Sequence, residues 1–448
     1  MSQTPETLTA QLLQAAKDAG AETADAIALQ GTSLSIEVRA GVLEQAERAE
    51  AVDLGLRVFV GQRSATVSAS DTRAATLQEM ALRAVAMARE APEDAFAGIA
   101  TPDQLAENMN AAHLELHDPT PEPTPQDLQR DATAAEEAAL ENGKITQVQS
   151  AMAGYSARNV HLAATNGFSA GYRRTSRGLS CVAIAGTGTA MERDHDGDSR
   201  IFQADLRSAE DIGRRAAERA VARLDARKPP TGQFPVLFDE RISASLIGHL
   251  LAAINGASVA RGASWLRDAL GEKVLPEALT LEENPHRPRV SASRPFDAEG
   301  LPTRSRNIVE NGVLTGWTLD LATGRKLGFP STGNAVRGTS SAPSPSSWNV
   351  TLTEGDANRA DLVREMGTGL LVTSMIGSTI NPNTGDYSRG AAGLWVENGQ
   401  ITHAVNECTI AGNLRDMLRE IVPANDARQH LSRVVPSLLV PGMTLAGI

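Results

Sequence analysis

The chain has 448 residues, of which 41% are hydrophobic and 21% are charged, ordinary values for a folded protein that argue against extended disorder. At about 150 residues per domain, this length predicts two large domains or three small ones. The formal net charge of −12 argues against a general binder of nucleic acids or anionic membranes, because both kinds of partner need a basic surface.

Three further features concern the cellular compartment. The first residues, MSQTPETLTAQLL, are polar and acidic and lack the basic start and apolar run of an export signal. No apolar run approaches the roughly 18 residues that a membrane span requires. The two cysteines, Cys181 and Cys408, lie far apart and form neither a disulfide framework nor a C-x-x-C pair. We therefore expect a cytoplasmic protein without membrane contact.

The first 91 residues predict a helix, several antiparallel strands and a second helix. Thr4 is a suitable cap for a helix that ends at Gly20. Alternating apolar residues over 34–38 and 54–60 are typical of strands with one face on a core. A long helix rich in Ala, Leu and Met then follows Asp71.

The same order of elements then recurs. Residues 92–124 are rich in Pro, Asp, Glu and Ala and predict a semi-extended connection. A helix is expected over 125–142 and strands over 144–189, with the Asn-Gly pair at 166–167 as a hairpin signal. A third long helix is predicted over 208–227, although the two halves share no residue-level repeat.

The paired prolines within residues 228–233 mark the best domain boundary, because they can continue neither the preceding helix nor the following strand. This divides the chain into a helix and antiparallel-sheet domain over 1–227 and a β-rich domain over 234–448. Two more Asn-Gly hairpin signals lie at 311–312 and 398–399. The predicted class is α+β, with a sandwich or open barrel in the carboxyl-terminal domain.

Several segments of the carboxyl-terminal half resemble one family. They are FDERISASLIGHLLAAINGASV, RNIVENGVLTGWTLDLATGRKLGFPSTGNA, NPNTGDYSRGAAGLWVENGQITHAVNECTIAGNLRDML and the terminal PSLLVPGMTLAG. Together they are similar to the TldD/PmbA family, and in particular to its PmbA branch, also called TldE. The resemblance covers nearly the whole chain, but its specific motifs lie after about residue 230.

The resemblance bears directly on metal binding. The catalytic branch of this family is a zinc peptidase whose ligands are both histidines of a His-Glu-x-x-x-His helix motif and a cysteine near the carboxyl terminus. Here the three motif positions hold Ala244, Ser245 and His249, and residues 428–448 contain no cysteine. A hydrolytic zinc site needs about three protein ligands and a nearby carboxylate. We therefore expect neither a metal nor a catalytic residue in this chain.

The resemblance also implies a partner. TldE-type chains pair with a TldD-type chain into a closed heterodimer around a cavity that unfolded peptides enter. The chain would then be the non-catalytic subunit of a zinc metallopeptidase that degrades unfolded proteins and trims modified peptide precursors, with the zinc in its partner. A homodimer of the isolated chain stays open.

Two alternative functions remain open on the sequence. The first is a stand-alone protein that binds extended peptides along a sheet edge. The second is an autonomous hydrolase with unrelated residues, but the serines within 340–347 form no G-x-S-x-G elbow and have no histidine nearby in sequence.

Candidate cavity residues have simpler structural explanations. His249 is interpreted first as a core or interface histidine with one ring nitrogen hydrogen-bonded, and second as a residue of the peptide cavity. Asp386 and Arg389, within a turn-rich segment, could pair with each other or bind a peptide. The acidic run over 194–198 does not fit a calcium loop and is predicted to be a solvated hairpin tip.

Overall fold

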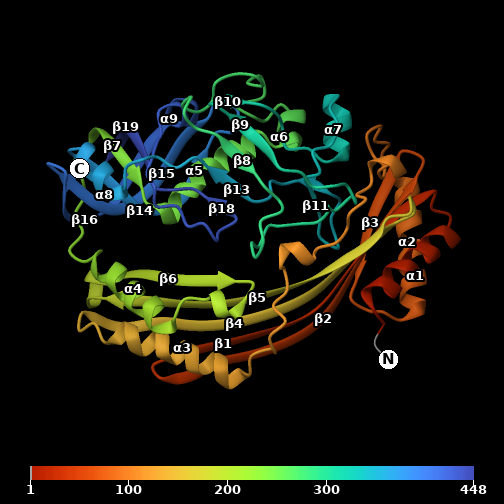
Figure 1. Ribbon diagram of the computed structural model, residues 1–448, viewed down its shortest axis with the longest axis horizontal. Helices are drawn as coiled ribbons and strands as arrows, with labels where there is room; N and C mark the ends of the chain where they lie inside the picture. Colours follow the sequence, from red (N-terminus) through yellow and green to blue (C-terminus); the bar gives the residue numbers. More distant parts are fainter. Residues whose placement is uncertain (1–2, 448) are drawn as a thin grey trace.

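The structure is a computed structural model that describes residues 3–447, with an antiparallel sheet in the amino-terminal half and a strand barrel in the carboxyl-terminal half (Figure 1). The predicted α+β class is confirmed. The first half contains α1 (Pro5–Asp18), β1 (Thr23–Arg39), β2 (Val42–Val60), β3 (Arg63–Ala69), α2 (Ala74–Glu90), η1 (Pro102–Gln104), η2 (Ala112–Leu114), α3 (Pro125–Leu140), β4 (Ile145–Ala164), β5 (Ser169–Ala185), η3 (Gly188–Ala190), β6 (Glu192–Arg200), η4 (Gln203–Asp205) and α4 (Ala209–Val221).

The second half alternates short strands and helices before four long strands. It contains β7 (Gly232–Phe238), α5 (Glu240–Ala253), α6 (Gly256–Ala260), β8 (Leu281–Glu283), β9 (Arg306–Glu310), β10 (Val313–Leu314), α7 (Leu321–Leu327), β11 (Ala335–Val336), β12 (Ser344–Pro345), β13 (Val350–Leu352), α8 (Arg359–Glu365), β14 (Gly369–Ile380), β15 (Asp386–Glu397), β16 (Gln400–Asn413), α9 (Leu414–Arg419), β17 (Val422–Pro423), β18 (Arg433–Val434) and β19 (Leu438–Ala446). The predicted domain limits stay a prediction, although the last helix of the first half ends at Val221 and β7 begins at Gly232.

One continuous sheet joins the two predicted repeats of the amino-terminal half. Its strand order is β3-β2-β1-β4-β5-β6, and all of its neighbours are antiparallel. The centre is the pairing of β1 with β4, which runs from Asp25 opposite Ala164 to Val38 opposite Ala151. The hairpin predicted at residues 166–167 connects β4 to β5.

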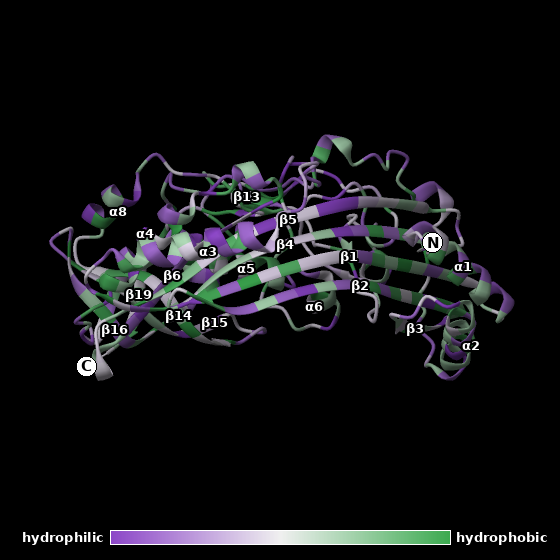
Figure 2. Ribbon diagram, turned by 90° about the horizontal axis from the view of Figure 1, so that it is seen from below, coloured by the Kyte–Doolittle hydropathy of each residue, from purple (hydrophilic) through white to green (hydrophobic). Residues whose placement is uncertain are grey.

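Both helix pairs of this half pack on the same face of the sheet. Even-numbered residues at 24–28 of β1 contact α1 and α2, and even-numbered residues at 34–38 contact α3 and α4. Hydrophobic and hydrophilic residues alternate over 34–38 of β1, whereas residues 26–29 are apolar throughout because both faces of the strand are covered there (Figure 2). Ile27 points to the opposite face, where it packs near Phe296 of the carboxyl-terminal half. The second half therefore covers the face that the helices leave free (Figure 1).

The carboxyl-terminal half is built on a closed barrel. The strand order β16-β15-β14-β7-β19 closes on itself, because β16 also pairs with β19 from Thr409 opposite Ala446 to Ala411 opposite Thr444. This closure differs from the sandwich or open barrel that we expected, because the pairing that closes the ring joins segments without a local sequence signal. The predicted hairpin at residues 398–399 links β15 to β16, and both of its residues have positive φ.

A smaller sheet shares its hydrophobic core with the barrel. Its order is β10-β9-β8-β13-β18, and the predicted hairpin at residues 311–312 joins β9 to β10. The loop over residues 284–305, between β8 and β9, reaches the free face of the long sheet, where Arg174 donates a hydrogen bond to the Ser291 carbonyl oxygen. Within residues 3–447, none of the helices is both long and apolar enough to cross a lipid bilayer.

The acidic run over residues 194–198 lies inside β6, so the predicted solvated hairpin tip is wrong. Asp194 and Asp196 are buried, the Asp198 side chain is 3% exposed, and all three pair with arginines. Asp196 lies 2.5 Å from Arg219 of α4, and Asp194 lies 3.2 Å from Arg241 of α5. The error arose because these arginines come from helices that are distant in sequence, so the acidic run alone looks like a solvent-exposed segment.

Candidate functional site

Helix α5, which carries the positions of the zinc motif, is capped at its start and packed along one face. The Asp239 carboxylate accepts a hydrogen bond of 3.2 Å from the Arg241 backbone N–H, which satisfies one of the free donors of the first turn. Leu246, Ile247 and Leu250 are buried in the barrel core. This arrangement fixes which side of the helix the motif positions occupy.

The three motif positions lie on α5 without a metal-binding arrangement. Ala244 packs against the barrel core and offers no lone pair. The Ser245 hydroxyl donates a hydrogen bond of 2.6 Å to the Ile242 carbonyl oxygen, so it is turned back onto its own helix. Neither side chain can replace the histidine and glutamate that a hydrolytic zinc site uses.

His249 is half-buried beside Tyr387. The two rings meet edge to face, with centroids 5.8 Å apart and an interplanar angle of 74°. The pKa of His249 lies below its ordinary value, mainly because of burial and secondarily because of the positive charge of Arg389. Its Nε2 atom is buried and has no hydrogen-bond partner among residues 3–447, whereas we expected one hydrogen-bonded ring nitrogen. The Nε2 atom is therefore buried without a described partner, in a ring that packs on Tyr387 and feels the charge of Arg389.

The remaining potential ligands do not complete a zinc site. Burial raises the pKa of the Cys408 thiol to about 11, and the thiol donates to the Ala391 carbonyl oxygen. Burial likewise raises the pKa of Cys181 to about 12. Residues 3–447 contain no cluster of three or more His, Cys, Asp or Glu side chains that could hold a metal ion. These residues do not fit the zinc site of the family's catalytic branch.

Asp386 and Arg389 lie at the start of β15 and do not pair with each other. Asp386 is exposed, and its carboxylate accepts hydrogen bonds from the Thr384 hydroxyl and the Asn413 amide, which lower its pKa. Arg389 donates a 2.7 Å hydrogen bond to the Gly377 carbonyl oxygen. Residues three apart on a strand point to opposite faces, which explains why the ion pair does not form. Their role in peptide binding stays a prediction.

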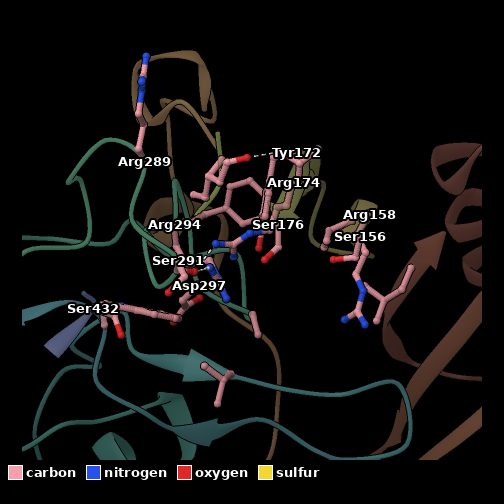
Figure 3. A pocket seen from close by; sticks show the side chains of 18 of the residues that line it. Ser156, Arg158, Tyr172, Arg174, Ser176, Arg289, Ser291, Arg294, Asp297 and Ser432 are labelled. Carbon is pink, nitrogen blue, oxygen red and sulfur yellow. Dashed lines mark hydrogen bonds between the residues drawn. The ribbon is translucent and has the colours of Figure 1, made fainter. Parts of the chain in front are cut away.

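A cavity of about 670 Å³ lies between the free face of the long sheet and the carboxyl-terminal half. The sequence did not predict it. Its walls come from β1, β4 and β5 on one side and from residues 289–298 and 430–432 on the other. Figure 3 shows Arg174, Arg294 and Ser291 close together in this cavity. The one local signal was the arginine-rich run of β5, but its meaning depends on which strand face each arginine occupies.

Comparisons with known proteins agree across the chain. Family models of the PmbA/TldA metallopeptidases match domain 1 at residues 24–88, the central domain at 118–224 and the C-terminal domain at 231–447. The metalloprotease PmbA of Escherichia coli O157:H7 is 37% identical over 446 residues, which cover 98% of this chain and 95% of that protein.

Solved structures show the same fold. A Bacteroides thetaiotaomicron protein, described as a candidate modulator of DNA gyrase, superposes with a TM-score of 0.91 at 27% identity and 98% coverage of both chains. TldE from Thermococcus kodakarensis has a TM-score of 0.85 at 20% identity, with 98% of this chain and 100% of that chain covered. From the family models and the PmbA relative together, the chain belongs to the PmbA/TldE branch of the PmbA/TldD metallopeptidase family.

Proposed function

We propose that this chain is the non-catalytic subunit of a heterodimeric zinc metallopeptidase of the TldD/TldE type, acting in the cytoplasm on unfolded or modified peptides. The family supports a role in proteolysis. The observation that carries the non-catalytic assignment is the surface of α5, where Ala244, Ser245 and a single imidazole at His249 stand in place of two ligands and a base. A TldD-type partner supplies the zinc and the base, and this chain completes the peptide-binding chamber.

Metal analysis and partner-dependent cleavage test this proposal. The purified chain should hold far less than one zinc per molecule after dialysis and should leave an unfolded casein substrate intact. Addition of a TldD-type chain should produce cleavage that a chelator abolishes. The control is the same partner with its own motif glutamate replaced by glutamine, which should restore nothing because the base is lost. Stoichiometric zinc and chelator-sensitive cleavage by this chain alone would overturn the proposal.

A second candidate, a stand-alone binder of extended peptides, is favoured by one open sheet edge. Strand β2 pairs with β1 along its whole length, but β3 covers its outer side only from Leu54 onward. The outer edge over residues 42–53 therefore presents unpaired backbone groups, and Val42 there is 65% exposed. An added peptide strand can satisfy such groups.

Hydrogen exchange separates the two functions. If the chain acts alone, a peptide should protect amides of residues 42–53 in the isolated chain. If the edge instead belongs to the heterodimer, protection should appear only when the TldD-type partner is present. Protection by peptide alone, without any cleavage in the mixture with the partner, would favour the second candidate.

A further inference from the structure

The cavity on the free sheet face contains arginines that no carboxylate neutralises. Arg158, Arg174 and Arg294 line it, and none of the three forms an ion pair within residues 3–447. Other arginines of the same lining are neutralised, since Arg200 pairs with Asp198 and Arg337 pairs with Asp25. Three unpaired cations in one cavity are unexpected in a chain whose net charge is −12.

The strand register places two of these cations against each other. Arg158 of β4 lies directly opposite Arg174 of β5. Directly opposite side chains in an antiparallel pair are close neighbours, and like charges there are destabilising. Both residues point to the face that the carboxyl-terminal half covers, as do their neighbours Val160 and Tyr172. The fold therefore accepts a repulsive pair at a place where a bound anion would relieve it.

The third cation approaches from the opposite wall. Arg174 and Arg294 both donate to the Ser291 carbonyl oxygen, the latter at 3.2 Å. Arg294 also lies over the Trp348 ring, 5.6 Å from its centroid. Arg294 donates a further hydrogen bond of 2.9 Å to the Ser293 carbonyl oxygen. Each guanidinium has five N–H donors, and neutral carbonyl oxygens cannot compensate two positive charges. The contacts hold the two guanidinium groups together beside Ser291 (Figure 3) and leave donors free for a ligand.

The one carboxylate that lines the cavity does not neutralise these arginines. Asp297 is 1% exposed, and it accepts backbone hydrogen bonds from Glu299, Leu301 and Ala335. Its charge is thus directed to a buried turn of the carboxyl-terminal half. The free donors of Arg174 and Arg294 therefore lack an internal anionic acceptor.

We propose that this cavity binds the carboxylate side chains of an extended acidic peptide. The planar guanidinium fork matches a carboxylate in two parallel hydrogen bonds. Val160 and Leu162 lie on β4 with Arg158, and Leu29 of β1 pairs with Val160, so charged and apolar contacts are available together. The volume of about 670 Å³ admits a short peptide segment rather than a folded domain. The proposal rests on the proposed function and adds a substrate class to it.

Fluorescence anisotropy of labelled peptides on the isolated full chain tests the proposal. The probe is an amidated octapeptide with four glutamates, compared with the same peptide carrying four glutamines. The glutamate peptide should bind at least about tenfold more tightly, and Arg174→Gln or Arg294→Gln should each weaken it about tenfold. The matched control is Arg83→Gln, an exposed arginine of α2 away from the cavity, which should leave the affinity unchanged. Equal binding of the two peptides, or equal losses in all variants, would overturn the proposal.

Competition by a small dicarboxylate and a lysine variant complete the test. Glutarate should compete at least about tenfold less well than the peptide, and equal affinity would show a site for small anions instead. Arg174→Lys keeps the charge but loses the fork, so it should retain part of the affinity and also serves if Arg174→Gln fails to fold. If the chain does not prefer the glutamate peptide but cleavage with the TldD-type partner is intact, only the acidic-peptide proposal is wrong. Selective binding without partner-dependent cleavage defeats only the subunit assignment.

Discussion

The arginines on the two faces of the amino-terminal sheet differ in whether a carboxylate pairs with them. On the helix face, the buried carboxylates of Asp194 and Asp196 neutralise Arg241 of α5 and Arg219 of α4. On the cavity face, Arg158 and Arg174 lie opposite each other without a carboxylate within residues 3–447. The same strand, β5, contributes to both faces. Among the described residues, the chain thus neutralises these helix-face arginines and leaves Arg158 and Arg174 on the cavity face unpaired.

Substitutions can distinguish an arginine that stabilises the fold from one that binds a ligand. Removing one partner of a buried ion pair leaves an uncompensated charge and costs stability. Removing one of two repelling cations relieves the fold and costs only what the cation binds. Stability and peptide affinity should therefore respond in opposite directions on the two faces.

The largest expected effect is on the helix face. Asp196→Ala should lower the free energy of unfolding by about 3 kcal/mol, because it leaves Arg219 and Arg207 without their shared, buried carboxylate. Urea denaturation followed by circular dichroism measures this change. The control Asp268→Ala removes an 86% exposed carboxylate and should cost less than about 0.5 kcal/mol. Equal stability of the two variants would mean that the helix-face ion pairs are not structural.

Replacing the two cavity arginines that contact Ser291 should change peptide affinity strongly and stability little. Arg174→Gln combined with Arg294→Gln should weaken the glutamate peptide roughly a hundredfold, while the urea midpoint stays constant or rises. Arg219→Gln is the reciprocal control on the helix face and should lose about 1–2 kcal/mol of stability with unchanged peptide affinity. If the double variant instead unfolds as readily as Asp196→Ala, the cavity arginines are structural and the contrast between the faces disappears.

The cavity face also contains a buried ion-pair cluster, which lies around Asp25 and away from Arg174. There, Asp25 of β1 binds Arg57 at 2.8 Å and also pairs with Arg337. Glu299 lies nearby, and burial together with Asp297 raises the pKa of Glu299 to about 8. Carboxylates are thus available on this face too, and their absence beside Arg174 is local.

Glu299 should make stability depend on pH. Its folded pKa lies above the ordinary value of 4.5, so between that pH and about 8 the folded chain binds more protons than the unfolded chain. Stability must then fall as pH rises through this window. Glu299→Gln keeps an oxygen that can accept the 2.8 Å hydrogen bond from the Leu321 N–H but cannot ionise. Its Tm should decline by a few degrees less than the native Tm between pH 5 and 8. The exposed Glu282→Gln serves as control, and a parallel decline in all three proteins would refute this origin of the slope.

Local signals predicted much of the fold, as the hairpins show. The Asn-Gly pairs at residues 166–167, 311–312 and 398–399 all connect neighbouring strands. Both residues have positive φ in the last two pairs and the glycine alone in the first, a backbone that these residue types adopt readily. The positions of the degenerate motif, Ala244, Ser245 and His249, were likewise located from the sequence through the family resemblance, and they lie on α5. What the sequence could not supply was the set of long-range neighbours, such as the arginines that bury the carboxylates of β6.

The face that Arg174 occupies depends on the register between β4 and β5, and a shift by one residue would change it. A two-residue turn at 166–167 would place Arg158 opposite Thr175, whereas the longer connection in the structure places it opposite Arg174. A one-residue shift moves every side chain of a strand to the other face, so the shorter turn would have sent Arg174 toward the helices. The position of the cavity arginines therefore follows from turn length, which the Asn-Gly signal alone does not determine.

The smallest expected effect is the most direct test of the repulsive pair. Arg158→Gln should raise the free energy of unfolding by roughly 0.5 kcal/mol, because it removes one of two like charges that face each other across β4 and β5. The gain should shrink as salt is added, since screening already weakens the repulsion in the native protein. Urea denaturation at low and high ionic strength measures both quantities. Arg83→Gln should show neither the gain nor its salt dependence, because that arginine lies on the exposed surface of α2. A stability loss on replacing Arg158 would show that the pair contributes to folding, and the cavity face would then resemble the helix face.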